Sequence, residues 1–253
     1  MKRKLTALID GDVIVYRFAY IGQEDIVWDN SPDGSSSRSH LEQTLYKVKE
    51  FVEGVLEATK ATDLVMCISS TTNFRKEVMP TYKSNRKKTV RPLLYQPIRD
   101  FLLEEYNSIM VDGLEADDML GILTTTSPLT TVCCSIDKDL NMIPGQHYNW
   151  NKRKRYAVIK ADTIPFFYTQ VLAGDPTDGY YGIPRVGPKT AEKILAGCTE
   201  EIDYWNACVD AYEAKGLTEE DCLQTARVAY ILQKDNYNRK TKEYTLWQPP
   251  KRK

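Results

Sequence analysis

The sequence lacks any apolar run long enough to cross a membrane. Its longest such stretches, near residues 6–9 and 13–15, are interrupted by Asp10 and Asp12, whereas a spanning helix needs about 20 apolar residues. The same aspartates break the stretch that follows the basic residues 1–4, so the start of the chain does not predict a secretion signal. We therefore expect a cytoplasmic protein that has no membrane partner.

Zinc-binding cysteine patterns are missing as well. The six cysteines form no C-x-x-C pair and have no histidine at zinc-finger spacing, so buried, reduced thiols are expected. Internal repeats are also absent. The chain has 253 residues with 42% apolar content, which is enough to bury one large core or a main domain with a smaller appendage.

Strands and helices are predicted to alternate along the first two thirds of the chain. Short apolar runs indicate buried strands at residues 5–9, 64–68 and 131–136. The first of these is expected to end in a turn at Asp10-Gly11. Helical periodicity is found at residues 41–59, 97–106, 116–125 and 163–173. This order predicts an α/β fold in which a mostly parallel central sheet is covered by helices on both faces.

The pattern changes at about residue 175. From there on the sequence predicts mainly helices, at residues 188–195, 202–214 and 219–233. We therefore predict two regions, an α/β core at residues 1–174 and a small helical region at residues 175–253 that packs on the core.

Two loops differ from the rest in composition. Residues 29–37 are rich in turn formers and are expected to form a mobile surface segment. Residues 71–97 are long and basic, and their positive side chains include Arg75, Lys76, Lys83, Arg86, Lys87, Lys88 and Arg91. Such a segment suits contacts with a phosphate backbone, and Tyr82 is available to stack on a base. A solvated loop would have the same composition.

Acidic residues gather at the ends of the predicted elements. The eight are Asp10, Glu115, Asp117, Asp118, Asp137, Asp139, Asp175 and Asp178. Functional groups collect at the carboxyl ends of strands in a parallel sheet, where converging carboxylates would repel one another unless cations neutralised them. Magnesium prefers oxygen ligands, and two such ions can drive hydrolysis of a phosphodiester. Each acid taken singly has an alternative role in capping a helix or complementing its dipole.

A glycine-rich turn precedes the first helix of the C-terminal region. It runs through Gly182, Arg185, Val186 and Gly187 to Pro188, and proline is favoured as the first residue of a helix. The free N–H groups at such a helix start can receive a phosphate, although an ordinary helix start would look the same. The basic runs at residues 152–155 and 251–253 are expected to be solvated surface.

Taken together, five ordered blocks make the chain similar to the flap endonuclease and 5′→3′ exonuclease superfamily, and most closely to the early exonucleases of short-tailed phages. The blocks are Leu8-Ile9-Asp10-Gly11, Phe74-Arg75-Lys76 with Tyr82-Lys83-Ser84-Asn85-Arg86, Gly113-Leu114-Glu115-Ala116-Asp117-Asp118, Ser135-Ile136-Asp137-Lys138-Asp139 and Gly174-Asp175-Pro176-Thr177-Asp178-Gly179. The resemblance covers nearly the whole chain. It implies the 5′ nuclease fold, which is related to PIN domains.

The resemblance also implies roles for these residues. Asp10, Glu115, Asp117 and Asp118 would bind a first Mg²⁺ or Mn²⁺ ion, and Asp137, Asp139, Asp175 and Asp178 would hold a second. Residues 71–97 would form a helical arch, in which Lys83 and Arg86 engage the scissile phosphate as catalytic residues alongside Asp118.

Further contacts with DNA are implied in the arch and in the C-terminal region. Residues 175–197 would form a helix-three-turn-helix element that holds the duplex and can bind K⁺. The implied DNA-binding residues are Arg75, Lys76, Tyr82, Lys83, Arg86, Gly182, Val186, Gly187, Lys189 and Thr190.

The chain departs from the family pattern at two places. Many relatives have another aspartate after the second strand, where this chain reads Ile68-Ser69-Ser70-Thr71-Thr72-Asn73, and Asp12 or extra water would have to take its place. Arg185 stands where relatives often have glycine, which puts the backbone conformation of that turn in question.

The favoured function is therefore metal-dependent hydrolysis of DNA that carries a 5′ end or flap, and of RNA primers paired with DNA, during phage replication in the host cytoplasm. A monomer is expected. One alternative is a nucleic-acid-binding module that has kept the fold and lost catalysis. The other is an RNA-cleaving nuclease of the related small α/β type.

Overall fold

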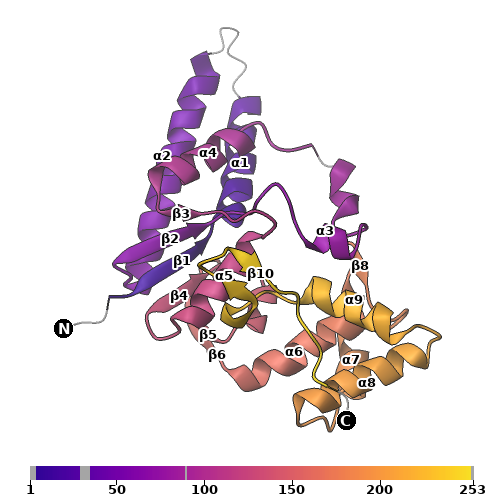
Figure 1. Ribbon diagram of the computed structural model, residues 1–253. Coiled ribbons are helices and arrows are strands. Elements are labelled where there is room, and N and C mark those ends of the chain that lie inside the picture. Colours follow the sequence, from indigo (N-terminus) through magenta and orange to yellow (C-terminus); the bar gives the residue numbers. More distant parts are fainter. Residues whose placement is uncertain (1–3, 29–34, 89, 252–253) are drawn as a thin grey trace.

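The computed structural model describes residues 4–28, 35–88 and 90–251, and its centre is a six-stranded sheet in the order β3-β2-β1-β4-β5-β6 (Figure 1). The strands are β1 Thr6–Asp10, β2 Asp63–Cys67, β3 Ser108–Ile109, β4 Thr131–Cys134, β5 Gly145–Asn149 and β6 Lys154–Val158. Neighbouring strands are parallel except β5 and β6, which pair antiparallel. The prediction of an α/β fold with a mostly parallel sheet is confirmed.

Strand β1 divides its side chains between two hydrophobic cores. Ala7 and Ile9 pack in a cluster with residues of α1 (Gly11–Trp28), α2 (Ser35–Thr59) and α4 (Tyr95–Glu105). Leu8 points to the other face, where α5 (Ala116–Thr126) and the C-terminal helices lie. Successive side chains of a strand alternate between the faces of its sheet, so one short apolar strand is buried on both sides.

The first helix was not foreseen from the sequence, and the predicted turn at Asp10-Gly11 is wrong. Helix α1 begins at Gly11 itself, and Asp10 caps it by accepting a hydrogen bond from the backbone N–H of Val13 at 3.2 Å. A Cβ at Gly11 would lie 2.8 Å from the carbonyl oxygen of Cys67. Glycine therefore lets α1 start directly against β2.

Helix α2 begins at Ser35, six residues before the predicted start, and takes up the end of the segment that was expected to be a surface loop. Residues 29–34 of that segment lie outside the described part of the chain.

The basic segment at residues 71–97, predicted as a long loop that would form a helical arch, contains short helical pieces. They are α3 (Arg75–Val78) and the 3-10 helix η1 (Ser84–Lys88), and α4 follows. The segment passes along one side of the molecule, above β8 (Tyr180–Tyr181) in Figure 1.

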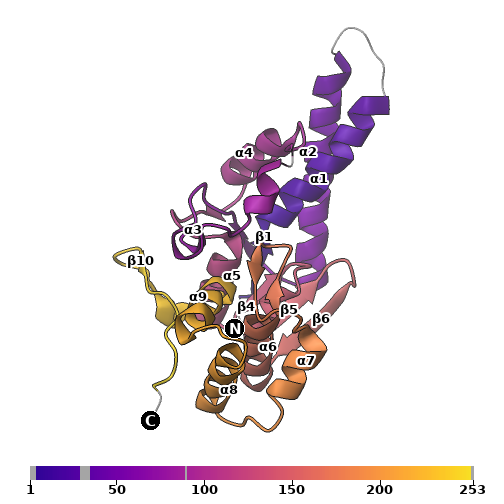
Figure 2. The same ribbon diagram turned by 90° about the vertical axis from the view of Figure 1, so that its right-hand side faces the viewer.

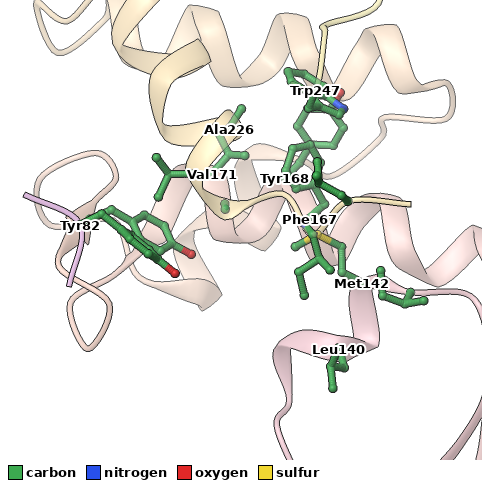
Figure 3. Packing of buried hydrophobic residues seen from close by; sticks show 14 of the residues in the cluster. Tyr82, Leu140, Met142, Phe167, Tyr168, Val171, Ala226 and Trp247 are labelled. Atoms are coloured by element: carbon green, nitrogen blue, oxygen red, sulfur yellow. The ribbon is translucent and has the colours of Figure 1, made fainter. Parts of the chain in front are cut away.

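The C-terminal part of the chain, from residue 160 onward, consists mainly of helices around a common core. The elements are α6 Lys160–Ala173, β7 Gly174–Asp175, β8, α7 Pro188–Ile194, α8 Glu201–Glu213, α9 Glu219–Ala229, η3 Lys234–Asn236, β9 Tyr237–Asn238 and β10 Glu243–Tyr244. Phe167 and Tyr168 of α6 pack against Trp247 (Figure 3). The ring of Trp247 also contacts that of Trp205. This core crosses the predicted boundary at residue 174, because α6 packs against the helices that follow it (Figures 1 and 2).

The last predicted helix ends at Ala229, four residues earlier than expected. Tyr230 is extended and its carbonyl accepts a hydrogen bond from Arg75, while the N–H of Leu232 bonds to Asp118. These tertiary contacts compete with a further helical turn.

The cysteines are free thiols, as predicted. Five are buried, and Cys198 is half-buried. No helix in the described ranges combines the length and apolar character that a bilayer crossing requires.

Candidate active site

Acidic side chains from four segments meet at the carboxyl edge of the sheet. Asp10 ends β1, and the parallel register that pairs Ile9 with Cys134 brings the end of β4 beside it. Asp137 and Asp139 follow β4, and Ser135 between them and the strand donates its hydroxyl to Asp10 Oδ2 at 2.6 Å. The topology therefore delivers two of the predicted acidic blocks to one place.

The charges of these acids act on one another. Burial, then the charges of Asp12 and Asp137, raises the pKa of Asp10 to about 7. Burial and the charges of Asp10, Asp137 and Glu115 raise the pKa of Asp117 well above its ordinary value. These carboxylates share one poorly solvated region, where the ionised forms are costly without a cation.

The acids predicted for the second metal ion lie next to those predicted for the first. Burial, then the charges of Asp137, Asp175 and Asp178, raises the pKa of Asp139 to about 6, against the opposing charge of Lys138. Asp139 Oδ1 also accepts a hydrogen bond from Gln170 of α6 at 2.6 Å. The predicted sets of the first and second metal ions thus lie side by side.

The pKa of Glu115 is lowered, whereas the pKa values of the neighbouring acids are raised. Burial alone would raise its pKa, but the charges of Lys83 and Arg75 outweigh burial and lower the pKa to about 2. Lys83 Nζ lies 2.6 Å from Glu115 Oε1 and 3.6 Å from Asp178 Oδ2. The ammonium group of Lys83 therefore lies between an acid predicted for the first metal ion, Glu115, and an acid predicted for the second, Asp178.

The base of the arch is fastened to this site. The N–H of Lys83 donates to the carbonyl of Asp178 at 2.6 Å, and Arg86 forms an ion pair with the Asp178 carboxylate. Asn85 Nδ2 donates to the carbonyls of Pro176 and Thr177, each at 3.2 Å. Both predicted phosphate-binding residues, Lys83 and Arg86, consequently neutralise site acids in this structure.

The chemistry of these residues suits divalent cations, although the carboxylates are not close enough together to coordinate an ion in the present arrangement. Among the described residues no group of three or more acids, histidines or cysteines is close enough to hold a metal ion. The donors are all carboxylate oxygens, which suits hard cations, and the ammonium group of Lys83 stands where positive charge is needed. A divalent ion would compete with this ammonium group for Glu115.

Asp118 does not fit its predicted role as a metal ligand and catalytic residue. It is fully buried, and its two oxygens accept hydrogen bonds from Arg75 Nη1 at 2.7 Å and Nη2 at 2.8 Å. The N–H groups of Glu115 and Leu232 also donate to it. In this structure Asp118 is thus the counter-ion of Arg75, and its hydrogen bond from the N–H of Glu115 is the helix-capping contact.

Arg75 and Tyr82, which the sequence predicted as DNA-binding residues, are buried and engaged with protein partners in this structure. All five N–H groups of Arg75 donate to protein acceptors, namely Asp118, Glu115 and the carbonyls of Val228 and Tyr230. Tyr82 is 4% exposed, lies in the buried cluster shown in Figure 3, and donates its hydroxyl to Glu115 at 2.8 Å. Buried side chains with satisfied partners are not free to contact a strand.

The predicted helix-three-turn-helix residues separate into exposed and packed groups. Gly187, Lys189 and Thr190 are exposed at the start of α7, whereas a Cβ at Gly182 would lie 2.6 Å from the carbonyl carbon of Leu172. Val186 is half-buried. Arg185 has a φ of 65°, so this turn holds a left-handed residue that is not glycine.

Several site residues were not predicted as such. Ser135, Asn85 and Gln170 hold acids or the arch in place, and Asp12 was predicted only as a possible substitute ligand. In the sequence, only the closeness of Asp12 to Asp10 could have indicated that Asp12 belongs to the site. Hydroxyl and amide partners carry no pattern that sequence alone can distinguish from ordinary polar residues.

A mostly parallel α/β sheet with carboxylates gathered at its carboxyl edge, beneath a basic segment, is the arrangement of a 5′ nuclease. The profile of the family described as "5′-3′ exonuclease, N-terminal resolvase-like domain" matches residues 5–165. Because the match covers more than half of the chain, the protein belongs to this 5′-3′ exonuclease family.

Individual relatives agree with this assignment. The chain is 27% identical over 284 residues to the exonuclease of Escherichia phage T7, covering 96% of this chain and 93% of the relative. It is 27% identical over 288 residues to the exodeoxyribonuclease of Enterobacteria phage T3, with 96% and 92% covered. The resemblance to phage exonucleases is confirmed, and the alternative of an inactive binding module is not favoured.

The fold is also similar to solved structures. The D15 flap endonuclease of bacteriophage T5, solved as a complex with DNA and metal ions, superposes with a TM-score of 0.64 at 16% identity, covering 89% of each chain. The T5 5′-exonuclease with bound zinc gives a TM-score of 0.62 at 18% identity, with 90% of this chain and 89% of that chain covered. At these identities the likeness concerns the fold.

Proposed function

We propose that this 5′ nuclease hydrolyses DNA that carries a 5′ end or flap, using two Mg²⁺ or Mn²⁺ ions. The observation that carries the proposal is the Lys83 ammonium group, which is held between Glu115 and Asp178 among mutually repelling carboxylates. A site with this charge pattern favours further cations. The T3 relative is named an exodeoxyribonuclease, and the T5 flap endonuclease was solved with DNA and metal ions, which supports this substrate class.

The acids divide into two ligand groups. Asp10, Glu115 and Asp117 would hold the first ion, and Asp137, Asp139, Asp175 and Asp178 the second. When bound, the ions would lower the pKa of an attacking water and offset charge on the phosphate. Asp118 is left out of the ligand set because Arg75 already occupies both of its oxygens.

Lys83 and Arg86 would act on the phosphate directly. Both pair with acids of the site in the structure, and this closeness to the proposed metal ligands supports the role. A phosphate that arrives with its metal ions offers them new anionic partners. Positive groups aimed at the phosphate stabilise the charge that develops there in the transition state.

Substrate binding would extend over two exposed surfaces. Lys76 on α3 and the start of α7, with Gly187, Lys189 and Thr190, are exposed and suit contacts with backbone phosphates. We further propose K⁺ binding at the turn before α7 and activity on RNA paired with DNA. We also propose that it works as a monomer in phage replication in the host cytoplasm; the phage sources of the two relatives support the phage setting.

The test is cleavage of a 5′-labelled flap duplex and a matched blunt duplex under single-turnover conditions, with Mg²⁺ or with EDTA. Asp117→Asn should lower the rate by at least about a hundredfold, because it removes a proposed metal ligand with little change in volume. Asp112→Asn, at an exposed aspartate in the loop before α5, is the matched control and should cleave normally. Product length separates single-nucleotide trimming from flap removal.

Cleavage by Asp117→Asn at the wild-type rate, or cleavage in EDTA at the same rate as in Mg²⁺, would contradict the two-metal mechanism. Cleavage of RNA alone, with both DNA substrates left intact, would support the RNA-nuclease alternative.

A further inference from the structure

The hairpin formed by β9 and β10 carries a cluster of positive charge outside the acidic site. The two strands pair antiparallel, with Tyr237 opposite Tyr244. The turn that joins them carries three exposed cations in four residues, namely Arg239, Lys240 and Lys242. None of the ion pairs found among the described residues involves these three side chains. Their charges are therefore available to an external anion.

Hydrogen bonds hold the backbone of this turn in one shape. Asn238 Oδ1 accepts from the N–H groups of Lys240 at 3.0 Å and Thr241 at 3.4 Å, a common use of asparagine in turns. The carbonyl of Asn238 accepts from the N–H of Lys242 at 2.8 Å. The turn thus keeps like charges close together, and such a concentration of positive charge attracts phosphates.

The strands of the hairpin are attached beside the active site. The ring of Tyr244 packs against that of Phe74, the residue before α3, with the ring centroids 5.2 Å apart. A Cβ at Gly113 would lie 3.3 Å from the same tyrosine ring. Gly113 is two residues before Glu115, and two residues span at most about 7 Å. The hairpin therefore begins at the base of the arch, close to a proposed metal ligand.

The hairpin and α7 lie on opposite sides of this part of the molecule. In Figure 2, β10 projects at the left and α7 lies at the right, with α9 and α6 between them. The exposed start of α7 suits contacts with the backbone of a duplex. A duplex held at α7, with its scissile phosphate at Lys83, leaves the side of the hairpin for the single-stranded part of the substrate.

We propose that the hairpin at residues 237–244 binds the single-stranded 5′ part of the substrate, with Arg239, Lys240 and Lys242 contacting its backbone phosphates. Such contacts hold a strand of any sequence. An acidic protein segment offers similar charge, but the attachment of the hairpin beside the active site favours the substrate. This inference rests on the proposed function and adds a binding surface to it.

The test is the affinity of the full chain for a flap duplex with about ten unpaired 5′ nucleotides and for a matched blunt duplex. Fluorescence anisotropy is measured in EDTA, which prevents metal-dependent cleavage, at several salt concentrations. The variant that loses all three charges carries Arg239→Gln, Lys240→Gln and Lys242→Gln. It should bind the flap duplex at least about tenfold more weakly at about 0.1 M salt, and the blunt duplex within about twofold of wild type. The slope of log affinity against log salt should become shallower by about 2 for the flap duplex, because each phosphate contact on a single strand contributes about 0.7.

Two further variants separate the charge of the hairpin from other effects. One removes three exposed lysines at the amino edge of the sheet, opposite the site, and should bind both substrates like wild type; it carries Lys4→Gln, Lys60→Gln and Lys160→Gln. The other keeps the charges of the hairpin and should also bind like wild type; it carries Arg239→Lys, Lys240→Arg and Lys242→Arg. Far-ultraviolet circular dichroism establishes that the variants are folded. If the neutral triple variant is unfolded, Lys240→Gln alone takes its place, with the slope shallower by about 0.7.

The outcomes separate the inference from the function on which it rests. Equal weakening of the flap duplex and the blunt duplex would overturn the assignment to the single strand. Unchanged affinity for both, with normal binding by wild type, would overturn the hairpin as a nucleic-acid surface and agree with an acidic protein partner. Failure of wild type to bind either substrate would contradict the proposed function, and this inference with it.

Discussion

Lys83 Nζ lies 2.6 Å from Glu115 Oε1, so the arch places a positive charge on an oxygen that the first metal ion would use. The same ammonium group is 3.6 Å from Asp178, in the second acidic group. Lysine and metal are therefore expected to compete for these acids until a phosphate gives Lys83 another partner.

The competition predicts opposite effects of Lys83→Met on binding and on catalysis. Mn²⁺ should bind the free variant about fivefold more tightly, because roughly 1 kcal/mol of unfavourable screened Coulomb energy is removed. The single-turnover cleavage rate should fall at saturating metal. Lys76→Met, an exposed change in the same arch, is the control, and weaker Mn²⁺ binding to Lys83→Met would contradict the competition.

The buried pair of Arg75 and Asp118 predicts a loss of stability. Asp118→Asn should lower the free energy of unfolding by about 3 kcal/mol, because it removes the nearer of the two carboxylates that pair with the buried guanidinium group of Arg75 and leaves only Glu115. Urea denaturation in EDTA measures this effect apart from metal binding. Arg75→Met should be similarly costly, and the double-mutant cycle should show a coupling of at least about 2 kcal/mol. Additive losses would mean that the pair acts as two independent residues.

Two glycines of the predicted DNA-binding set are expected to behave differently. Gly182→Ala should lower the free energy of unfolding by about 2 kcal/mol or more, because the new methyl group would overlap the carbonyl of Leu172. Gly187→Ala has open space around its Cβ and a φ of −101°, so it should cost under about 1 kcal/mol. If Gly187 faces the duplex, its variant should instead lose affinity for DNA, as measured by fluorescence anisotropy. Equal stability of the two variants would contradict the close packing at Gly182.

The raised pKa of Asp10 predicts how stability depends on pH. Between its ordinary value of 3.8 and about 7, the folded protein keeps a proton that the unfolded chain has released. In EDTA the stability of wild type relative to Asp10→Asn should therefore fall as pH rises through this window, by about 1.4 kcal/mol for each unit of the shift. Above about pH 7 both states are ionised and the difference becomes constant.

Mg²⁺ should reverse this trend, because it binds the ionised form of Asp10. Urea denaturation at about pH 5.5 and about pH 8, with and without Mg²⁺, should show greater stabilisation by the metal at the higher pH. Stabilisation that is equal at both values would mean that Asp10 does not release a proton to the metal.

Much of the fold could be predicted because its signals are local. The apolar run that ends at Asp10 identifies β1, and the pattern of residues 116–125 identifies α5 almost to the residue. Helix α1 was missed because Asp10-Gly11 looks like a turn. Only the close approach of β2 to Gly11 shows why a glycine is needed within this helix start.

The neighbouring residues Asp117 and Asp118 show where sequence reasoning ends. The sequence by itself determined that this 5′-3′ exonuclease would carry acids at the ends of its strands, because strand ends and helix starts are encoded in short patterns. It gave the two aspartates the same role, since they lie in one motif. Successive residues of a helix point about 100° apart, so the fold directs Asp117 toward the charge of Asp10 and buries Asp118 against Arg75, 43 residues away in sequence. Only the tertiary structure decides between these two environments, because the partners come from distant segments.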